Sequence, residues 1–215
     1  MGQKEWTTGW GDLTNVEART DEARRSVVET RRQAYSRDVN CQGVALCDDF
    51  DSAPNTLSYI LLKGQVPRGD SRAMGSVRVS MRGLEQDPVS TPCSRIFASE
   101  LQRLFADSRF VEVSRLAICP SSYDDGFRLY LAIMQNGIRV AEENKCDFIL
   151  APTVIEHVRL YRGMGFEQVA EARQYYGGMV CCLLALDWRA QGAVLRNHKR
   201  FHRLFADWNA RELAA

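Results

Sequence analysis

The segment that most constrains this chain is Val111-Glu-Val-Ser-Arg-Leu-Ala-Ile118, an apolar, β-branched run that carries a glutamate and an arginine. The pattern predicts a buried strand. Burying an ionised carboxylate or guanidinium costs several kcal/mol, so each charge needs a partner or a role. Because side chains alternate along a strand, Glu112 and Arg115 face one cleft only if the strand contains a bulge. We therefore predict a bulged strand at the floor of an active site; the alternative is a structural ion pair.

Bulk properties limit the class of protein. A chain of 215 residues that is 45% hydrophobic, without a Pro-, Gly- or Ser-rich linker, predicts a single domain over residues 1–215, with an N-terminal helix and a C-terminal helical extension. The net charge of +1 argues against a globally basic nucleic-acid binder. Seven cysteines without a C-x-x-C pair favour reduced thiols in the cytoplasm. The start lacks the apolar core of a signal peptide, and the longest apolar run, 179–186, is too short for a transmembrane segment.

Hydrophobic periodicity and capping signals predict the elements. Expected strands cover residues 58–63, 75–82, 111–118, 147–153, 166–170 and 179–187. Expected helices cover 20–37, 94–107, 156–164 and 196–208, with a further helix that begins at a capping box, Ser122-x-x-Asp125, and ends near Asn144. In the helix over 94–107, Phe97, Leu101, Leu104 and Phe105 should share one apolar side. This order predicts an α/β (α+β) fold with a mixed sheet.

The closing half carries a family resemblance. Leu160-Tyr-Arg-Gly-Met-Gly-Phe166 stands at a helix-to-strand turn, where Gly165 would supply a positive φ. This half resembles the GCN5-related N-acetyltransferase (GNAT) superfamily. The resemblance implies an acyl-CoA N-acyltransferase fold, a central mixed twisted sheet with helices on both faces.

Four further motifs narrow the resemblance. They are Arg31-x-x-x-Tyr35, Asp48-Asp-Phe-Asp51, Gly75-Ser-Val-Arg78 and Glu112-Val-Ser-Arg115. Their order is similar to that in the branch containing the N-acyl amino acid synthases and the acyl-homoserine-lactone (autoinducer) synthases.

Two departures distinguish between these relatives. The lactone synthases usually carry a tryptophan shortly after the arginine-aromatic pair, but residues 36–47 contain none. The CoA-using acetyltransferases have a Gly-rich pyrophosphate loop, whereas Cys119–Asp125 has no glycine, and Asp124 and Asp125 would repel a pyrophosphate. An acyl group on the phosphopantetheine of acyl carrier protein needs no such loop. The resemblance thus favours an N-acyl amino acid synthase without a tightly bound cofactor.

Amide formation from a thioester needs a proton acceptor for the amine. Glu112 is the candidate base, acting directly or through a water, with Arg115 beside it. Pairing with Arg115 would lower the pKa of Glu112, so burial or a water relay must offset it. Tyr35 and Tyr161 are candidates to line the pocket or to protonate the leaving thiolate; packing is the alternative for each.

Other motif residues are candidates for binding the amino acid. Arg31 and Arg78 suit its carboxylate, because a guanidinium matches two carboxylate oxygens. Asp48 and Asp51 would hold the α-ammonium or orient the arginines, and Ser114 belongs to the same substrate-binding set. The alternatives are a solvated helix face for Arg31 and ordinary turn residues for the aspartates.

The sequence therefore predicts a cytoplasmic acyltransferase that moves a long-chain fatty acyl group from acyl carrier protein to the α-amine of an amino acid. An acyl-homoserine-lactone synthase using S-adenosylmethionine and a non-catalytic acyl-ligand or carrier-binding module are the alternatives. The predicted carrier contacts are Arg196, Lys199, Arg200 and Arg203. No metal is expected, because the pair His198 and His202 lies among cations and has no third ligand in the sequence pattern.

Overall fold

One eight-stranded mixed sheet organises the computed structural model, which describes residues 4–38, 41–64, 72–83, 90–120, 125–175, 178–199 and 201–205. The strands are β1 (Glu5–Thr7), β2 (Leu13–Glu17), β3 (Thr56–Lys63), β4 (Arg72–Arg82), β5 (Phe110–Ile118), β6 (Phe148–Val154), β7 (Glu167–Gln174) and β8 (Val180–Asp187). The helices are α1 (Asp21–Tyr35), α2 (Ala98–Phe105), α3 (Gly126–Glu143), α4 (Val158–Arg162) and α5 (Trp188–Asn197). The short 3₁₀ turns are η2 (Asp49–Ser52), η3 (Pro92–Arg95), η5 (Ile155–His157) and η7 (His202–Phe205).

The strand order is β1-β2-β3-β4-β5-β6-β8-β7, and β5 with β6 is the parallel pair. The other neighbours in the sheet run antiparallel. The predicted α/β class with a mixed sheet is confirmed. Within the described residues, no helix is long and apolar enough to span a bilayer.

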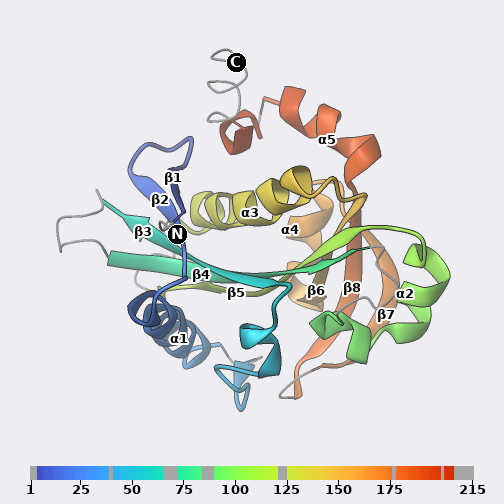
Figure 1. The fold of residues 1–215 in the computed structure, drawn as a ribbon, viewed down its shortest axis with the longest axis horizontal. Helices are drawn as coiled ribbons and strands as arrows, with labels where there is room; N and C mark the ends of the chain where they lie inside the picture. Colours follow the sequence, from blue (N-terminus) through green and yellow to red (C-terminus); the bar gives the residue numbers. More distant parts are fainter. Residues whose placement is uncertain are drawn as a thin grey trace.

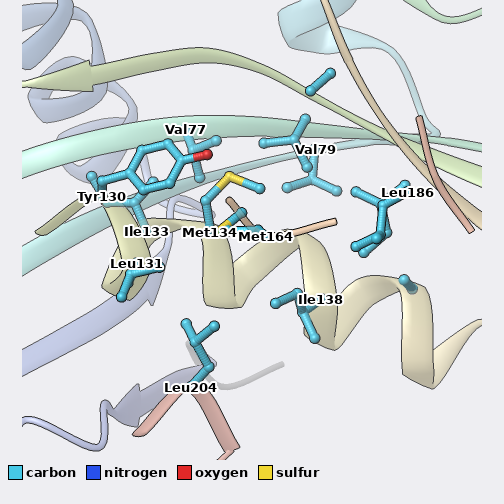
Figure 2. Packing of buried hydrophobic residues seen from close by; sticks show 14 of the residues in the cluster. Val77, Val79, Tyr130, Leu131, Ile133, Met134, Ile138, Met164, Leu186 and Leu204 are labelled. Atoms are coloured by element: carbon cyan, nitrogen blue, oxygen red, sulfur yellow. The ribbon is translucent and has the colours of Figure 1, made fainter. Parts of the chain in front are cut away.

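Helices cover both faces of the sheet (Figure 1). Helix α1 packs on β3, β4 and β5 from one face, while α3 packs on the strands from β2 to β6 from the other. Every residue of α3 from Leu129 to Ala141 is buried, as expected for a helix covered on all sides. On its sheet side Ile133 and Met134 point toward Val77 and Val79 of β4, and Leu204 lies on its other side (Figure 2).

The parallel strands β5 and β6 separate after a short paired stretch. Their register runs from Phe110 opposite Phe148 to Glu112 opposite Leu150, whereas β5 continues to Ile118 and β6 to Val154. Pro152 lies in the separated part of β6 and has no N–H to offer a neighbouring strand. The sequence of β6 therefore helps to open a gap in the sheet.

Strand β5 contains the predicted bulge. Ser76 of β4 pairs with Ala117 and Arg78 pairs with Ser114, so Val77 alone lies opposite two residues of β5. One of these two is Arg115, whose φ of 52° is in the left-handed region that non-glycine residues rarely adopt. The bulge reverses the side-chain alternation at Arg115, which then shares a face with Ser114.

Two expected helices differ from the structure. The helix over 94–107 is two pieces, η3 and α2, and Leu104 is 39% exposed whereas Phe97, Leu101 and Phe105 are buried. An eight-residue helix has room for a narrow buried face only, and Leu104 falls outside it. Helix α3 begins at Gly126 after an N-cap at Asp125 that makes no side-chain hydrogen bond, and the predicted capping box falls on Ser122, which lies outside the described residues.

The predicted terminal helix over 196–208 is wrong as well. Helix α5 begins earlier, because the Asp187 carboxylate at the end of β8 accepts a hydrogen bond from the Ala190 N–H at 3.0 Å, and it ends at Asn197. His198 then has an extended backbone, and the turn η7 follows; Trp208 lies outside the described residues. The predicted positive φ of Gly165 is confirmed at 88°.

Candidate active site

A cavity of about 350 Å³ occupies the gap between β5 and β6. On the α1 side of the sheet it is lined by polar groups that include Arg78, Ser114 and Arg115. On the α3 side the lining is mostly apolar and includes Phe127 and Leu160. The cavity therefore crosses the sheet and joins a charged end to an apolar end.

Two arginines at the charged end share one aspartate. Arg78 Nη1 donates to Asp48 Oδ1 at 2.6 Å, and Arg115 Nη2 donates to Asp48 Oδ2 at 2.7 Å. Arg78 also donates from Nε to Ser114 Oγ at 3.2 Å. The Arg78 side chain is 1% exposed and that of Asp48 is 18% exposed, so these bonds are made largely out of water. The Asp48 carboxylate therefore fixes the direction of both guanidinium groups.

A third arginine supports this arrangement from α1. Arg31 Nη1 donates to Asp51 Oδ1 and to the Leu46 carbonyl, both at 2.9 Å. Asp51 in turn accepts the Asp48 N–H at Oδ2 and closes a capping box around η2. The Arg31 side chain is 1% exposed, which excludes the solvated helix face for it. Arg31 lies outside the cavity lining, and its Nε and Nη2 have no hydrogen-bond partner among the described residues.

Neighbouring charges and hydrogen bonds set the direction of the pKa shifts in this network. Burial raises the pKa of Asp48, but the charges and hydrogen bonds of Arg78 and Arg115 outweigh it, so the pKa lies below its ordinary value. Burial lowers the pKa of Arg115, and the hydrogen bond to Asp48 more than offsets this. Three arginines and two aspartates leave one net positive charge beside the cavity.

Glu112 lies on the same strand but outside this network. It is completely buried, and its Oε2 accepts the Cys93 N–H at 2.8 Å. The Tyr175 hydroxyl is 3.5 Å from the other oxygen, Oε1. The predicted pairing with Arg115 is wrong, since Arg115 bonds Asp48 and the Ala45 carbonyl. Burial, opposed by the Cys93 N–H, instead raises the pKa of Glu112.

Comparison with known proteins identifies the family of this chain. The family model described as N-acyl amino acid synthase FeeM matches residues 26–187, a span that holds every residue of the network and Glu112. The chain belongs to this family. No curated protein sequence matches it. The member of the FeeM family described here is therefore an N-acyltransferase.

Solved structures show the fold that this family member adopts. The structure of FeeM, an N-acyl amino acid synthase from uncultured soil microbes, has a TM-score of 0.64 and 18% identity over 88% of this chain and 96% of that one. A CoA-dependent acyl-homoserine lactone synthase, BjaI, with SAM and isopentyl-CoA, has a TM-score of 0.58 and 15% identity over 85% and 86%. An acyl-CoA N-acyltransferase from Pseudomonas aeruginosa has a TM-score of 0.55 and 12% identity over 86% and 99%. These matches confirm the GNAT fold.

The two tyrosines predicted for the site of this FeeM-family chain, Tyr35 and Tyr161, line the cavity. Tyr35 is half-buried, and burial, opposed by Arg31, raises its pKa. Burial raises the pKa of Tyr161 to about 12, and its ring packs edge-on against Tyr130 at 5.5 Å between centroids. Sequence reasoning missed Tyr175, because nothing in its local pattern separates it from an ordinary residue near a hairpin turn.

Of the predicted carrier-binding residues, Arg196 lies far from this cavity along α3. Arg196 on α5 bonds Glu142 and lies over the Phe205 ring. Gly126, which lines the cavity, is sixteen residues before Glu142, and at 1.5 Å per residue the separation is about 24 Å. Lys199 and Arg203 are exposed, whereas Arg200 lies outside the described residues. Arg196 therefore lies at the end of α3 remote from the cavity, whereas Leu204, next to Arg203, meets the middle of α3, where its carbonyl accepts a hydrogen bond from Gln135.

Among the residues that the structure describes, no group of three or more His, Cys, Asp or Glu side chains is placed to hold a metal ion.

Proposed function

We propose that this protein transfers a long-chain fatty acyl group from the thioester of acyl carrier protein to the α-amine of an amino acid. The observation that carries the proposal is the cavity through the gap between β5 and β6, which joins a cationic end to an apolar end. The carboxylate of an amino acid matches the cationic end, and an acyl chain matches the apolar end. Amide formation would bring the two substrates together at the sheet.

Arg78 and Arg115 are the proposed carboxylate-binding pair. Both line the cavity, and both are held by Asp48 so that their remaining donors are fixed in direction. One net positive charge in the network balances one substrate carboxylate. In this arrangement Arg31 orients Asp51 and the loop before η2, and acts on the substrate through them.

The reaction forms one C–N bond and breaks one C–S bond. The neutral amine attacks the thioester carbonyl carbon, the amine loses a proton, and the sulfur leaves with its electron pair and is protonated. Glu112 is the proposed acceptor of the proton that the amine loses, and its raised pKa improves it as a base relative to an exposed carboxylate. The apolar lining around Phe127 and Leu160 suits the acyl chain of the thioester.

The acidic composition of Asp124 and Asp125 supports a carrier-bound donor over a free acyl-CoA. Contact with an acidic carrier needs cations near the cavity, and Arg159 and Arg162 are exposed on either side of Leu160 on α4. We propose this α4 pair as the docking surface. The set with Lys199 and Arg203 is the second surface to test, because its member Arg196 lies far from the cavity along α3.

Mass spectrometry of reactions with acyl carrier protein or acyl-CoA, each with a mixture of amino acids or with S-adenosylmethionine, tests the proposal. We expect N-acyl amino acid from the carrier donor and its loss in Glu112→Gln. Charge reversal of Arg159 and Arg162 should lower kcat/KM for the carrier donor and remove its salt dependence, whereas reversal of Lys199 should leave both unchanged. A lactone product from S-adenosylmethionine, or equal salt-insensitive use of acyl-CoA, would contradict the proposal.

A further inference from the structure

Glu112 is too deeply enclosed to meet a substrate directly. Its exposed fraction is 0%, and it is not among the described residues that line the cavity. Its Oε2 accepts the Cys93 N–H at 2.8 Å, which leaves Oε1 as the oxygen directed to the Tyr175 hydroxyl at 3.5 Å. Tyr175 lines the cavity. The connection from the cavity to the buried carboxylate therefore passes through the Tyr175 phenol.

The surroundings hold the Tyr175 ring in this place. It follows β7 directly, and its N–H donates to the Met179 carbonyl at 2.5 Å across the turn to β8. The ring stacks on Phe97, with centroids 6.4 Å apart and an interplanar angle of 24°. Tyr175 is 8% exposed, so water competes little for its hydroxyl. A group fixed in this way is suited to pass a proton along one defined path.

We propose that Tyr175 is a catalytic residue whose hydroxyl relays the amine proton to Glu112. The inference rests on the proposed N-acyl transfer. As the C–N bond forms, the amine gives its proton to the Tyr175 oxygen, while the original phenolic proton moves to the Glu112 carboxylate. The C–S bond then breaks, and the proton returns from Glu112 through Tyr175 to the departing sulfur. The products are an amide and a free thiol, and both side chains end in their starting states.

Tyr175→Phe removes the hydroxyl and keeps the ring that stacks on Phe97. We expect kcat to fall about 100- to 10,000-fold, with little change in KM for the amino acid, because the hydroxyl acts on the proton and not on substrate binding. Glu112→Gln should lose a similar factor, and the double variant should lose little more, since both residues serve one path. Tyr59→Phe, in the core beside Trp6, is the matched control and should retain full kcat.

A second measurement does not depend on turnover. With carboxyl-¹³C glutamate, the Glu112 resonance is the one missing from Glu112→Gln, and its pKa should rise in Tyr175→Phe because the carboxylate loses a donor. Wild-type kcat in folded Tyr175→Phe, additive losses in the double variant, or an unchanged Glu112 pKa would each overturn the relay. Absence of acyl product from the wild type, together with a shifted Glu112 pKa, would overturn the proposed reaction and leave the proton contact intact.

Discussion

Asp48→Asn tests whether one carboxylate holds the two arginines at the charged end of the cavity. The substitution keeps the shape and one oxygen, which preserves the Arg78 contact, but it places an amide N–H₂ group against the Arg115 donor. The net charge of the network rises from +1 to +2. This charge is poorly solvated, because the Arg78 side chain is 1% exposed and that of Arg115 is 8% exposed. Removing one partner of a buried ion pair costs about 3–5 kcal/mol.

The partial exposure of Asp48 and the oxygen that asparagine retains favour the lower limit, about 3 kcal/mol. For a chain of this size each kcal/mol shifts Tm by about 2–4 °C, so we expect a fall of about 6–12 °C by calorimetry at pH 7. The pKa of Asp48 is lowered in the folded state. Its stabilising contribution is therefore present above the unfolded value of about 3.9 and is lost as pH falls through the folded value, so the two Tm values should converge in acid.

Asp49→Asn is the matched control for this experiment. The Asp49 side chain is 93% exposed, and its nearest cation, Arg95, is 3.9 Å away and half-exposed. Its Tm should stay within about 1 °C of the wild type, because such exposed pairs contribute little. Equal Tm values for Asp48→Asn and wild type at pH 7 would refute the assignment of Asp48 as the residue on which both arginines depend.

Two further predictions concern stability. Glu112→Gln should raise Tm at pH 8, because the pKa of Glu112 is raised in the folded state and its charged carboxylate therefore destabilises the fold as pH rises. The gain in Tm should vanish below about pH 4, where the carboxyl group is neutral in both states. A lower Tm of the variant at pH 8 would contradict this prediction. Gly137→Ala should destabilise by about 1–3 kcal/mol in chemical denaturation despite the better helix propensity of alanine, since its Cβ would lie 2.4 Å from Val113 Cγ2. Gly126→Ala, with nothing within 4 Å, is the control and should not destabilise.

The sequence predicted the class of fold because most strands and the long helix carry strong local patterns. The alternation of Val77, Val79 and Met81 and the helical spacing from Leu131 to Ala141 are signals of this kind. The bulge was also predictable, because two charges three residues apart in an apolar strand have few other solutions. Strands β1 and β2 were missed, since three and five residues are too short for a clear period.

The residues that make up the site were easier to predict than the contacts between them. Motif order brought Arg78, Arg115 and Asp48 into one set, but it did not indicate which cation each carboxylate would meet. Whether Arg115 reaches Glu112 or Asp48 depends on the direction of its side chain after the bulge, a tertiary property. The terminal helix was displaced for a local reason, because the capping role of Asp187 was overlooked.

The short register between β5 and β6 also has a mechanical consequence. Three residue pairs, Phe110 to Glu112 with Phe148 to Leu150, join these two strands, and beyond them each strand keeps its other neighbour. The pairs form a narrow hinge between two blocks of strands, with α3 packed across both. We expect a small rotation about this hinge to change the width of the gap without breaking the pairing inside either block. Such a rotation would move Glu112 least, because Glu112 lies on the paired stretch itself.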